Sequence, residues 1–198
     1  MTLVLATRNP GKISEIKALL SGVRVVPAAS FAGCPEPEET GRTFEENALI
    51  KARAVSRYTG RTALADDSGL EVDALDGAPG VRSARYAGTD ATDQDNIRRL
   101  LDALDGISDA DRTARFRCVV AVVVPDGRSW TAEGACEGRI LQATRGDAGF
   151  GYDPLFVPAC YESTFAELDA GVKNRISHRA QALGRITDVL KGLADLTD

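Results

Sequence analysis

The stretch LVLATRNPGK, residues 3–12, begins with a short apolar run that predicts a buried strand. The run breaks at Arg8-Asn9-Pro10-Gly11, and a helical pattern follows, with Ile13, Ile16 and Leu20 at three- and four-residue spacing. The first backbone N–H groups of a helix are unpaired and carry a partial positive charge. The stretch therefore predicts a strand, a tight turn and a helix start that together form an anion site.

Strand and helix signals continue to alternate along the chain. Residues 23–26 predict a second strand, and Thr43 with Glu46 three positions later is a capping box that starts a helix. Residues 62–65 predict a further strand, which ends at Asp66-Asp67-Ser68-Gly69.

The second half of the chain combines helices with a hairpin. Its predicted elements are a helix capped by Thr92 and Asp95, strands at 116–124 and 129–140, a short strand around 154–157, and a final helix with Leu183, Ile186, Leu190 and Leu193 on one stripe. Pro125-Asp126-Gly127-Arg128 is the turn signal between the two long strands. The run 119–124 is apolar without alternation, which predicts a central strand covered on both faces. Together these elements predict an α/β fold with a mixed sheet, in one domain spanning residues 1–198.

The composition disfavours several classes of protein. The chain has 198 residues, of which 43% are hydrophobic and 27% charged, and these are ordinary globular values. A net charge of -5 without a basic block disfavours nucleic-acid binding. The longest apolar run, 118–124, is far shorter than the ~18 residues of a membrane span. With no signal-peptide pattern, no C-x-x-C pair and a single histidine, we expect a cytoplasmic protein with reduced thiols and no zinc site.

Thr7, Asn9 and Lys12 supply polar groups at the first strand-to-helix turn. A phosphate there can accept hydrogen bonds from backbone N–H groups, the Thr7 hydroxyl, the Asn9 amide and the Lys12 ammonium. The stretch lacks the pattern of a Walker A loop. A turn with a solvated lysine is the alternative, because Asn-Pro-Gly is common turn chemistry.

Asp66 and Asp67 place two carboxylates where the predicted strand meets a loop. Adjacent residues of a strand point to opposite faces, so only one of the two is expected in a shared site. Carboxylate oxygens suit Mg²⁺, which takes few protein ligands together with waters and substrate phosphates. Glu38 or Glu39 can supply a second oxygen ligand. An Asx-type turn and an exposed acidic loop are the alternatives.

Two further groups of residues suit the recognition of a purine. Phe150-Gly151-Tyr152-Asp153 combines aromatic rings with a carboxylate that can accept from a ring N–H, although such aromatics often serve only as core residues. Lys173 and Ser177-His178-Arg179 gather basic donors near the start of the last helix. Donors aimed at position 6 of a purine favour a 6-oxo group over a 6-amino group, which separates hypoxanthine and xanthine from adenine.

In their order along the chain, these signals resemble the inosine triphosphate pyrophosphatase family, also called the non-standard purine nucleoside triphosphate pyrophosphatases. The matching segments are 6–12, 39–48, 64–70, 77–86, 149–154 and 173–179. Each segment is a weak signal alone, but their joint occurrence over nearly the whole chain is highly specific.

The resemblance implies both a fold and an activity. The expected fold is an elongated mixed sheet with flanking helices, arranged as two lobes with the active site in the cleft between them, in a homodimer. The expected reaction is the Mg²⁺-dependent hydrolysis of ITP, dITP and XTP to the monophosphate and pyrophosphate, which removes deaminated purines from the nucleotide pool.

The resemblance also implies a role for each matching residue. Asp67 is the expected proton acceptor and a Mg²⁺ ligand, and Glu39, beside Thr40-Gly41, is the expected second ligand in preference to Glu38. The expected substrate-binding residues are Thr7, Arg8, Asn9, Pro10, Gly11 and Lys12 for the triphosphate, Ser68 beside the substrate, and Phe150, Gly151, Tyr152, Asp153, Lys173, His178 and Arg179 around the nucleoside.

The expected mechanism is attack of a water on the α-phosphorus with pyrophosphate as the leaving group. Either Asp67 or the metal activates the water, and the sequence leaves both open. Two other functions also remain: a related Maf-type pyrophosphatase that acts on pyrimidine or modified nucleotides, and a regulatory module that binds ITP or XTP without turnover.

Overall fold

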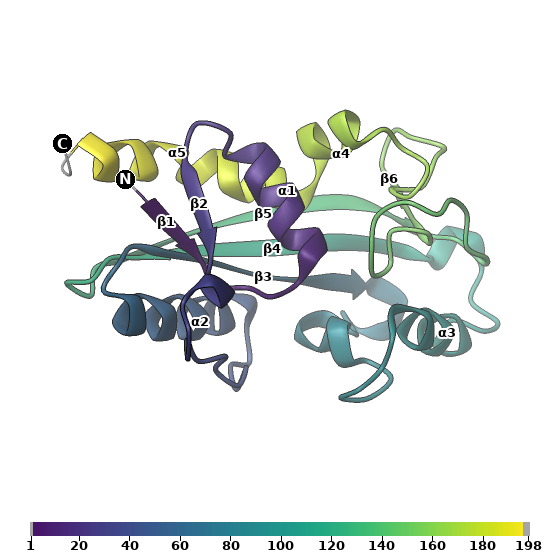
Figure 1. The fold of residues 1–198 in the computed structure, drawn as a ribbon. Helices are drawn as coiled ribbons and strands as arrows, with labels where there is room; N and C mark the ends of the chain where they lie inside the picture. Colours follow the sequence, from purple (N-terminus) through teal and green to yellow (C-terminus); the bar gives the residue numbers. More distant parts are fainter. Residues whose placement is uncertain (1, 196–198) are drawn as a thin grey trace. The chain divides into compact units, whose positions relative to one another are not determined.

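The computed structural model describes residues 2–195, which form a mixed α/β fold with one six-stranded sheet flanked by helices (Figure 1). The strands hydrogen-bond in the order β2-β1-β3-β4-β5-β6. They are β1 (Thr2–Leu5), β2 (Arg24–Pro27), β3 (Ala63–Val72), β4 (Thr113–Val123), β5 (Ser129–Ile140) and β6 (Phe156–Pro158). The α-helices are α1 (Pro10–Leu19), α2 (Phe44–Thr59), α3 (Asp93–Ala103), α4 (Ala170–Ile176) and α5 (His178–Asp195). The predicted fold class is confirmed.

Two compact units make up the chain. The first comprises residues 1–67, 118–134 and 179–198, and the second comprises residues 68–117 and 135–178. Strands β3, β4 and β5 contribute residues to both. The assignment of residues 1–198 to one domain and the location of the site in a cleft between lobes stay predictions.

In the first unit, helices lie on both faces of the sheet. Strand β1 is parallel to β2 and to β3, with Val4 opposite Ala63. Helices α1 and α5 cover one face and α2 covers the other (Figure 1). Ile16 of α1 and Leu183, Ile186 and Leu190 of α5 are buried against the strands in one hydrophobic cluster. The predicted stripe of the last helix is therefore a core-facing stripe, as expected for an amphipathic helix.

Helices α2 and α3 begin at the N-cap residues predicted from the sequence. The Thr43 hydroxyl accepts from the backbone N–H of Glu46 at 3.2 Å, at the start of α2. The Glu46 carboxylate accepts from the backbone N–H of Arg42 at 2.6 Å, so the return bond of this box reaches one residue further back than predicted. At α3, Thr92 and Asp95 form the complete capping box.

The prediction that a strand ends at residues 66–69 is wrong, because β3 continues to Val72. All four residues lie inside this strand, so no turn forms there. Leu70 and Val72 are fully buried in the core of the second unit. Burial of these apolar side chains and sheet pairing outweigh the local turn preference of Asp-Ser-Gly. The alternative of an Asx-type turn is thereby also excluded.

Aromatic rings pack against one another in the core of the second unit. The rings of Phe116 and Phe156 meet edge to face at 4.7 Å, and those of Phe156 and Phe165 lie 5.1 Å apart. Strand β6 pairs antiparallel with β5 and contributes Phe156. Such pairs contribute about 0.5–1.5 kcal/mol beyond their area burial.

The basic residues at the end of the chain do not start one helix. Lys173 lies in the separate short helix α4, which ends at Ile176 with Ser177 as its C-cap, and α5 begins at His178. Ser177 has extended backbone, with φ -66° and ψ 154°. Because the backbone turns there, Lys173 and Arg179 do not belong to one helical face.

Arg112 fixes the end of α3 within the second unit. Its guanidinium donates to the backbone carbonyls of Leu104 at 2.9 Å, Ile107 at 3.1 Å and Leu141 at 3.4 Å. We expect Arg112→Met to lower the free energy of unfolding by about 2–4 kcal/mol, because the carbonyls of Ile107 and Leu141 lose their Arg112 donor at a cost of roughly 1–3 kcal/mol each, whereas that of Leu104 keeps the backbone N–H of Ile107.

Urea unfolding of Arg112→Met against wild type measures this effect. The matched control is Arg98→Met, which removes an exposed i,i+3 ion pair with Asp95 and is expected to change stability by less than about 1 kcal/mol. Equal stability of the two variants would contradict the assignment of Arg112.

Among residues 2–195, no helix is long and apolar enough to cross a membrane. The four cysteines are unbridged, and Cys34, Cys118 and Cys136 are buried whereas Cys160 is exposed.

Candidate active site

The stretch that follows β1 forms the predicted strand-turn-helix. Pro10 occupies the first helical position of α1 and Asn9 is its N-cap. The Asn9 side-chain oxygen accepts from the backbone N–H of Lys12 at 3.1 Å, and the Thr7 hydroxyl accepts from the backbone N–H of Asn9 at 3.2 Å. The side-chain oxygen of Asn9 thus caps the helix, which leaves the side-chain NH₂ group of Asn9 as the group suited to a phosphate.

Arg8 reaches the acidic loop that follows β2. Its guanidinium lies 3.1 Å from the Glu36 carboxylate, and both side chains are mostly exposed. It also donates to the carbonyl of Cys34 at 3.5 Å. Exposed ion pairs of this kind are weak, so this pair does not fix Arg8 in place.

Asp66 is fully buried and lies between two cations of the first unit. The Lys12 ammonium is 3.0 Å from its carboxylate, and the Arg179 guanidinium donates to it at 3.1 and 3.3 Å. Arg179 also pairs with Glu15. Burial alone would raise the pKa of Asp66, but the charges of Lys12 and Arg179 outweigh it and hold the pKa well below its ordinary value.

Asp67 meets a different set of side chains. The Lys51 ammonium is 2.7 Å from the Asp67 carboxylate and 2.7 Å from that of Glu39. The Asn47 amide donates to Asp67 at 3.3 Å. Burial raises the pKa of Asp67, against the opposing effect of Lys51. The two neighbouring aspartates thus have separate partners, as expected for successive strand residues, and Glu39, not the exposed Glu38, shares a lysine with Asp67.

Asn47 and Lys51 of α2 belong to this site and were not singled out from the sequence. Lys51 is one turn after Asn47, so both side chains lie on one side of the helix. Asn47 is fully buried and its side-chain oxygen accepts from the backbone N–H of Gly41 at 2.8 Å. Asn47 lies inside the matching segment 39–48, which was the available signal for this part of α2, whereas nothing in the sequence marked Lys51.

Gly41 permits a close approach of the Glu39 loop to α2. A Cβ at this position would lie 2.6 Å from the Asn47 side-chain oxygen and 2.9 Å from its backbone nitrogen. We expect Gly41→Ala to lower kcat/KM for the reaction proposed below by roughly 10- to 100-fold, because a displacement of about 1 Å at a site can cost about 10²-fold. Steady-state kinetics measure the effect, with Gly22→Ala as the control because nothing lies within 4 Å of the added Cβ. Full activity of Gly41→Ala would contradict the requirement for this approach.

The loop before β6 holds the second group of predicted residues. In the second unit, the Asp153 carboxylate accepts from the backbone N–H of Phe150 at 2.9 Å and from the Lys173 ammonium at 2.6 Å. The Lys173 nitrogen also lies 5.1 Å from the centre of the Phe150 ring, within cation–π range. Phe150, Asp153 and Lys173 are therefore brought together.

The remaining predicted residues of this unit have structural contacts. The backbone N–H of Gly151 donates to the Asp93 carboxylate at 2.7 Å. Tyr152 is buried, and its hydroxyl donates to the carbonyl of Ser83 at 2.9 Å. The His178 ring stacks on Phe116 at 4.8 Å. Tyr152 thus packs in the core, which was one of the two interpretations of the aromatic residues in this segment.

The predicted site residues are distributed over both units. Those of the first unit are Thr7, Arg8, Asn9, Pro10, Gly11, Lys12, Glu39, Asp67 and Arg179. Those of the second are Ser68, Phe150, Gly151, Tyr152, Asp153, Lys173 and His178. Arg179, expected near the nucleoside, pairs with Asp66 and Glu15 in the first unit. The substrate and catalytic roles of all these residues stay predictions.

A sequence model of the Ham1 family matches residues 3–189. The chain belongs to the Ham1 family. It is 54% identical over 195 residues to a dITP/XTP pyrophosphatase of Desulforamulus reducens. The alignment covers 98% of this chain and 97% of that protein. The chain is 48% identical over 190 residues to the dITP/XTP pyrophosphatase of Bacillus subtilis, with 95% and 96% coverage. The resemblance inferred from the sequence motifs is confirmed.

Solved structures of Ham1 proteins share the fold. A HAM1 protein from Coxiella burnetii superposes with a TM-score of 0.87 at 45% identity, over 97% of this chain and 99% of that one. The Staphylococcus aureus Ham1 protein gives a TM-score of 0.86 at 40% identity with the same coverage.

The carboxylates of this Ham1 chain fit a divalent cation. Among the described residues, no group of three or more His, Cys, Asp or Glu side chains could hold a metal ion. Glu39 and Asp67 nevertheless converge on a single cation, the Lys51 ammonium, at 2.7 Å each. Mg²⁺ is commonly held by one or two carboxylates, with water and substrate phosphates as its other ligands. Glu39 and Asp67 therefore match the donor set that Mg²⁺ uses.

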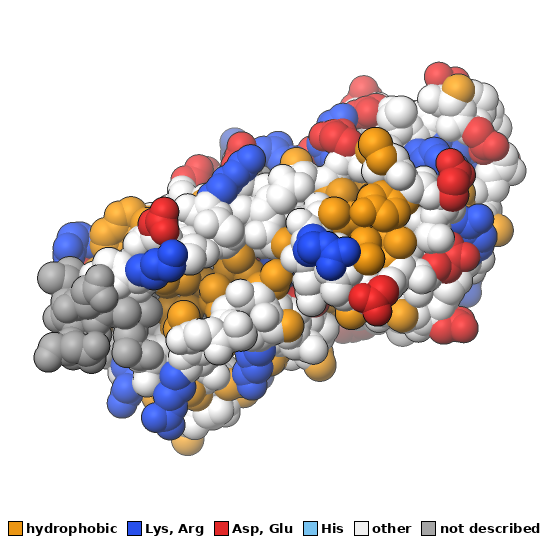
Figure 2. Space-filling model, turned by 90° about the horizontal axis from the view of Figure 1, so that it is seen from above, with side chains coloured by type: hydrophobic (Ala, Val, Ile, Leu, Met, Phe, Trp, Pro, Cys, Tyr) orange, Lys and Arg blue, Asp and Glu red, His pale blue; other side chains and the backbone are white. Residues whose placement is uncertain are grey.

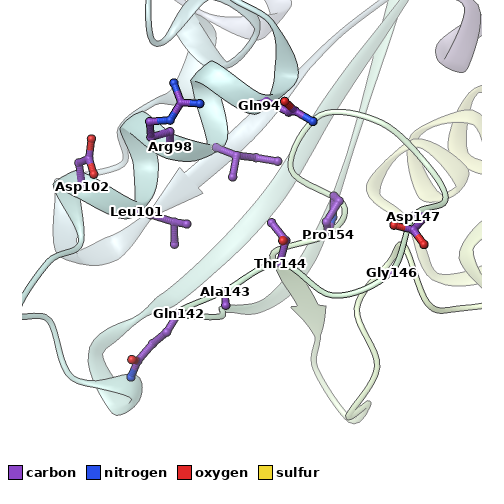
Figure 3. Close-up of a pocket in the computed structure, with 11 residues that line it drawn as sticks. Gln94, Arg98, Leu101, Asp102, Gln142, Ala143, Thr144, Gly146, Asp147 and Pro154 are labelled. Carbon is purple, nitrogen blue, oxygen red and sulfur yellow. The ribbon is translucent and has the colours of Figure 1, made fainter.

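A separate pocket of this Ham1 chain lies in the second unit and has a volume of about 660 Å³. Residues of α3, among them Leu101, and the segment from Gln142 to Thr144 line it (Figure 3). None of the predicted substrate residues lines this pocket. On the face that Figure 2 shows, side chains of both charges occur next to hydrophobic ones, so charge alone does not mark a binding surface there.

Proposed function

We propose that this chain hydrolyses non-standard purine nucleoside triphosphates, namely dITP, XTP and ITP, to the monophosphate and pyrophosphate. Two findings support this activity. The chain belongs to the Ham1 family, and it is 54% and 48% identical to two dITP/XTP pyrophosphatases over nearly its full length. The structural observation that carries it is the convergence of Glu39 and Asp67 on one cation, in the same unit as the strand-turn-helix of residues 7–12. The function is the removal of deaminated purines from the nucleotide pool.

In this proposal the first unit holds the triphosphate. The backbone at the start of α1, the Asn9 NH₂ and the Lys12 ammonium bind phosphate oxygens and neutralise their charge. Glu39 and Asp67 hold Mg²⁺, which supplies further neutralisation of the phosphates and acidifies water when it is bound. Lys51, now between these carboxylates, would give up at least one of its two contacts to the metal.

Asp67 is the proposed proton acceptor. A water loses its proton to the Asp67 carboxylate while its oxygen forms a bond to the α-phosphorus. The bond from that phosphorus to the bridging oxygen breaks, and pyrophosphate leaves with the bonding electron pair. Burial raises the pKa of Asp67, whereas the Lys51 ammonium, and a divalent cation when one is bound, would oppose that rise.

Phe150, Asp153 and Lys173 are the proposed contacts to the base. A ring N–H of hypoxanthine or xanthine can donate to Asp153, and the 6-oxo group can accept from Lys173. Adenine presents a 6-amino group to the same ammonium, so both would be donors. The proposed nucleoside environment is completed by Ser68, Gly151, Tyr152, His178 and Arg179. We further propose that the protein is a homodimer in the cytoplasm.

Product analysis with a panel of nucleotides tests the function. Pyrophosphate and orthophosphate release are measured with ITP, XTP, GTP, ATP and dTTP, with Mg²⁺ and with EDTA. We expect Mg²⁺-dependent pyrophosphate release from ITP and XTP with ATP nearly inert. A preference for dTTP would favour a Maf-type enzyme instead, and ITP binding without turnover would favour a nucleotide sensor.

A further inference from the structure

Asp66 is a buried carboxylate that has no part in the chemistry proposed above. Its side chain is inaccessible to solvent, and it receives Lys12 from the first turn of α1 and Arg179 from the first turn of α5. These two cations come from helices that are far apart in the sequence, and β3 supplies the carboxylate between them. Arg179 brings a second carboxylate, Glu15, so the four charges balance.

The geometry separates Asp66 from the proton acceptor. Asp66 and Asp67 are neighbours in β3, where successive side chains point to opposite faces. Asp67 contacts Asn47 and Lys51, whereas Asp66 contacts Lys12 and Arg179. Asp66 can therefore act on a ligand through the cations that it holds, Lys12 and Arg179.

Lys12 is the partner through which Asp66 can affect a ligand. Its side chain runs from the helix start that Asn9 caps to the buried carboxylate and is 15% exposed, so part of it is accessible beside the buried cluster. A lysine on a flexible four-carbon stem otherwise samples many conformations, and an ammonium held before binding avoids the entropic cost of being ordered by the ligand.

We propose that Asp66 is a positioning residue that holds the Lys12 ammonium in place for a triphosphate chain. This inference rests on the proposed function for the assignment of Lys12 to phosphate binding. Asp66 itself does not touch the substrate. Its effect on phosphate binding exists only while Lys12 is present, and this dependence separates positioning from a general loss of structure.

A double-mutant cycle tests the dependence. The binding of tripolyphosphate with Mg²⁺ is measured by calorimetry for wild type, Asp66→Asn, Lys12→Met and the double variant. We expect each single substitution to weaken binding at least tenfold, and the double variant to bind no more than about threefold more weakly than Lys12→Met, because coupled residues are not additive. Wild-type affinity in Asp66→Asn, or multiplication of the two effects, would overturn the proposal.

Two further variants control for folding and for charge. The double variant Asp66→Asn/Arg179→Gln keeps the net charge of the four-residue cluster at zero. It removes the Arg179 charge together with that of Asp66, so no buried positive charge is left unbalanced. This variant is used if Asp66→Asn alone does not fold. It is still expected to bind at least tenfold more weakly, and recovery of wild-type affinity would overturn the proposal. Glu15→Gln removes the other carboxylate on Arg179 and leaves the pair of Lys12 and Asp66, so binding should stay within about threefold of wild type. A loss as large as that of Asp66→Asn would assign the effect to Arg179 instead.

The outcome is separable from that of the proposed function. Tripolyphosphate carries no base and requires no turnover. If wild type releases no pyrophosphate from ITP but the cycle shows coupling, the proposed activity fails and the positioning role stands. If ITP is hydrolysed and the cycle shows no coupling, the reverse holds.

Discussion

Replacement of Asp67 by asparagine is expected to lower kcat for ITP hydrolysis by roughly 10²–10⁴-fold, which is the usual loss when a general base is removed. Asparagine preserves the shape of the side chain but cannot accept the proton of the attacking water. It also lacks the charge that, together with Glu39, fits a divalent cation. Steady-state kinetics at saturating ITP and Mg²⁺ measure the effect.

Asp126→Asn is a matched control for this substitution. Asp126 lies in the turn between β4 and β5, where its carboxylate accepts from the backbone and side chain of Arg128. Its substitution should leave kcat unchanged. If Asp67→Asn kept more than about a tenth of the wild-type kcat, the loss would be below the usual range for a general base and the role would be abandoned.

Replacement of Lys173 by methionine is the second large effect. We expect it to lower the ratio of kcat/KM for ITP to that for ATP by roughly 10- to 100-fold, because a hydrogen bond to a charged group contributes about 1.5–3 kcal/mol. The Lys173 ammonium lies beside Asp153 and the Phe150 ring, so its loss affects the proposed contacts of the base and leaves the residues of the first unit in place. Kinetics with both nucleotides measure the ratio.

Two comparisons make the Lys173 result interpretable. Arg175→Met lies on the same helix but is exposed, so it should keep the ITP/ATP ratio. Removing Lys173 leaves Asp153 buried without its cation, which can lower the free energy of unfolding by about 3–5 kcal/mol. Thermal denaturation therefore verifies that the variant is folded, and the assay temperature is set below its melting temperature. A folded Lys173→Met enzyme with the wild-type ratio would remove Lys173 from base selection.

Local signals account for the parts of the fold that could be predicted from the sequence. The predicted limits of β5 match the structure because a turn sequence precedes it and its side chains alternate. The N-caps Thr43 and Thr92 are correct because capping depends on residues only three positions apart. The motifs also identified the family, whereas the choice of Glu39 over Glu38 as the metal ligand stays a prediction, and Glu39 shares Lys51 with Asp67.

The features that could not be predicted depend on contacts between distant residues. The segment Asp66 to Gly69 has turn-like composition, but sheet pairing and the burial of Leu70 extend the strand through it. The pairing of Arg179 with Asp66 joins residues 113 positions apart. Lys51 gave no signal because a lysine on a helix is ordinarily a solvated residue, and only the folded chain brings it to Glu39 and Asp67.

Hydrolysis of ITP in ¹⁸O-labelled water, with the products separated and weighed by mass spectrometry, tests the central claim most directly. Attack of water on the α-phosphorus predicts ¹⁸O in the inosine monophosphate and unlabelled pyrophosphate, formed with Mg²⁺ and absent with EDTA. Labelled orthophosphate together with inosine diphosphate, or label in the pyrophosphate, would place the attack at another phosphorus and contradict the account.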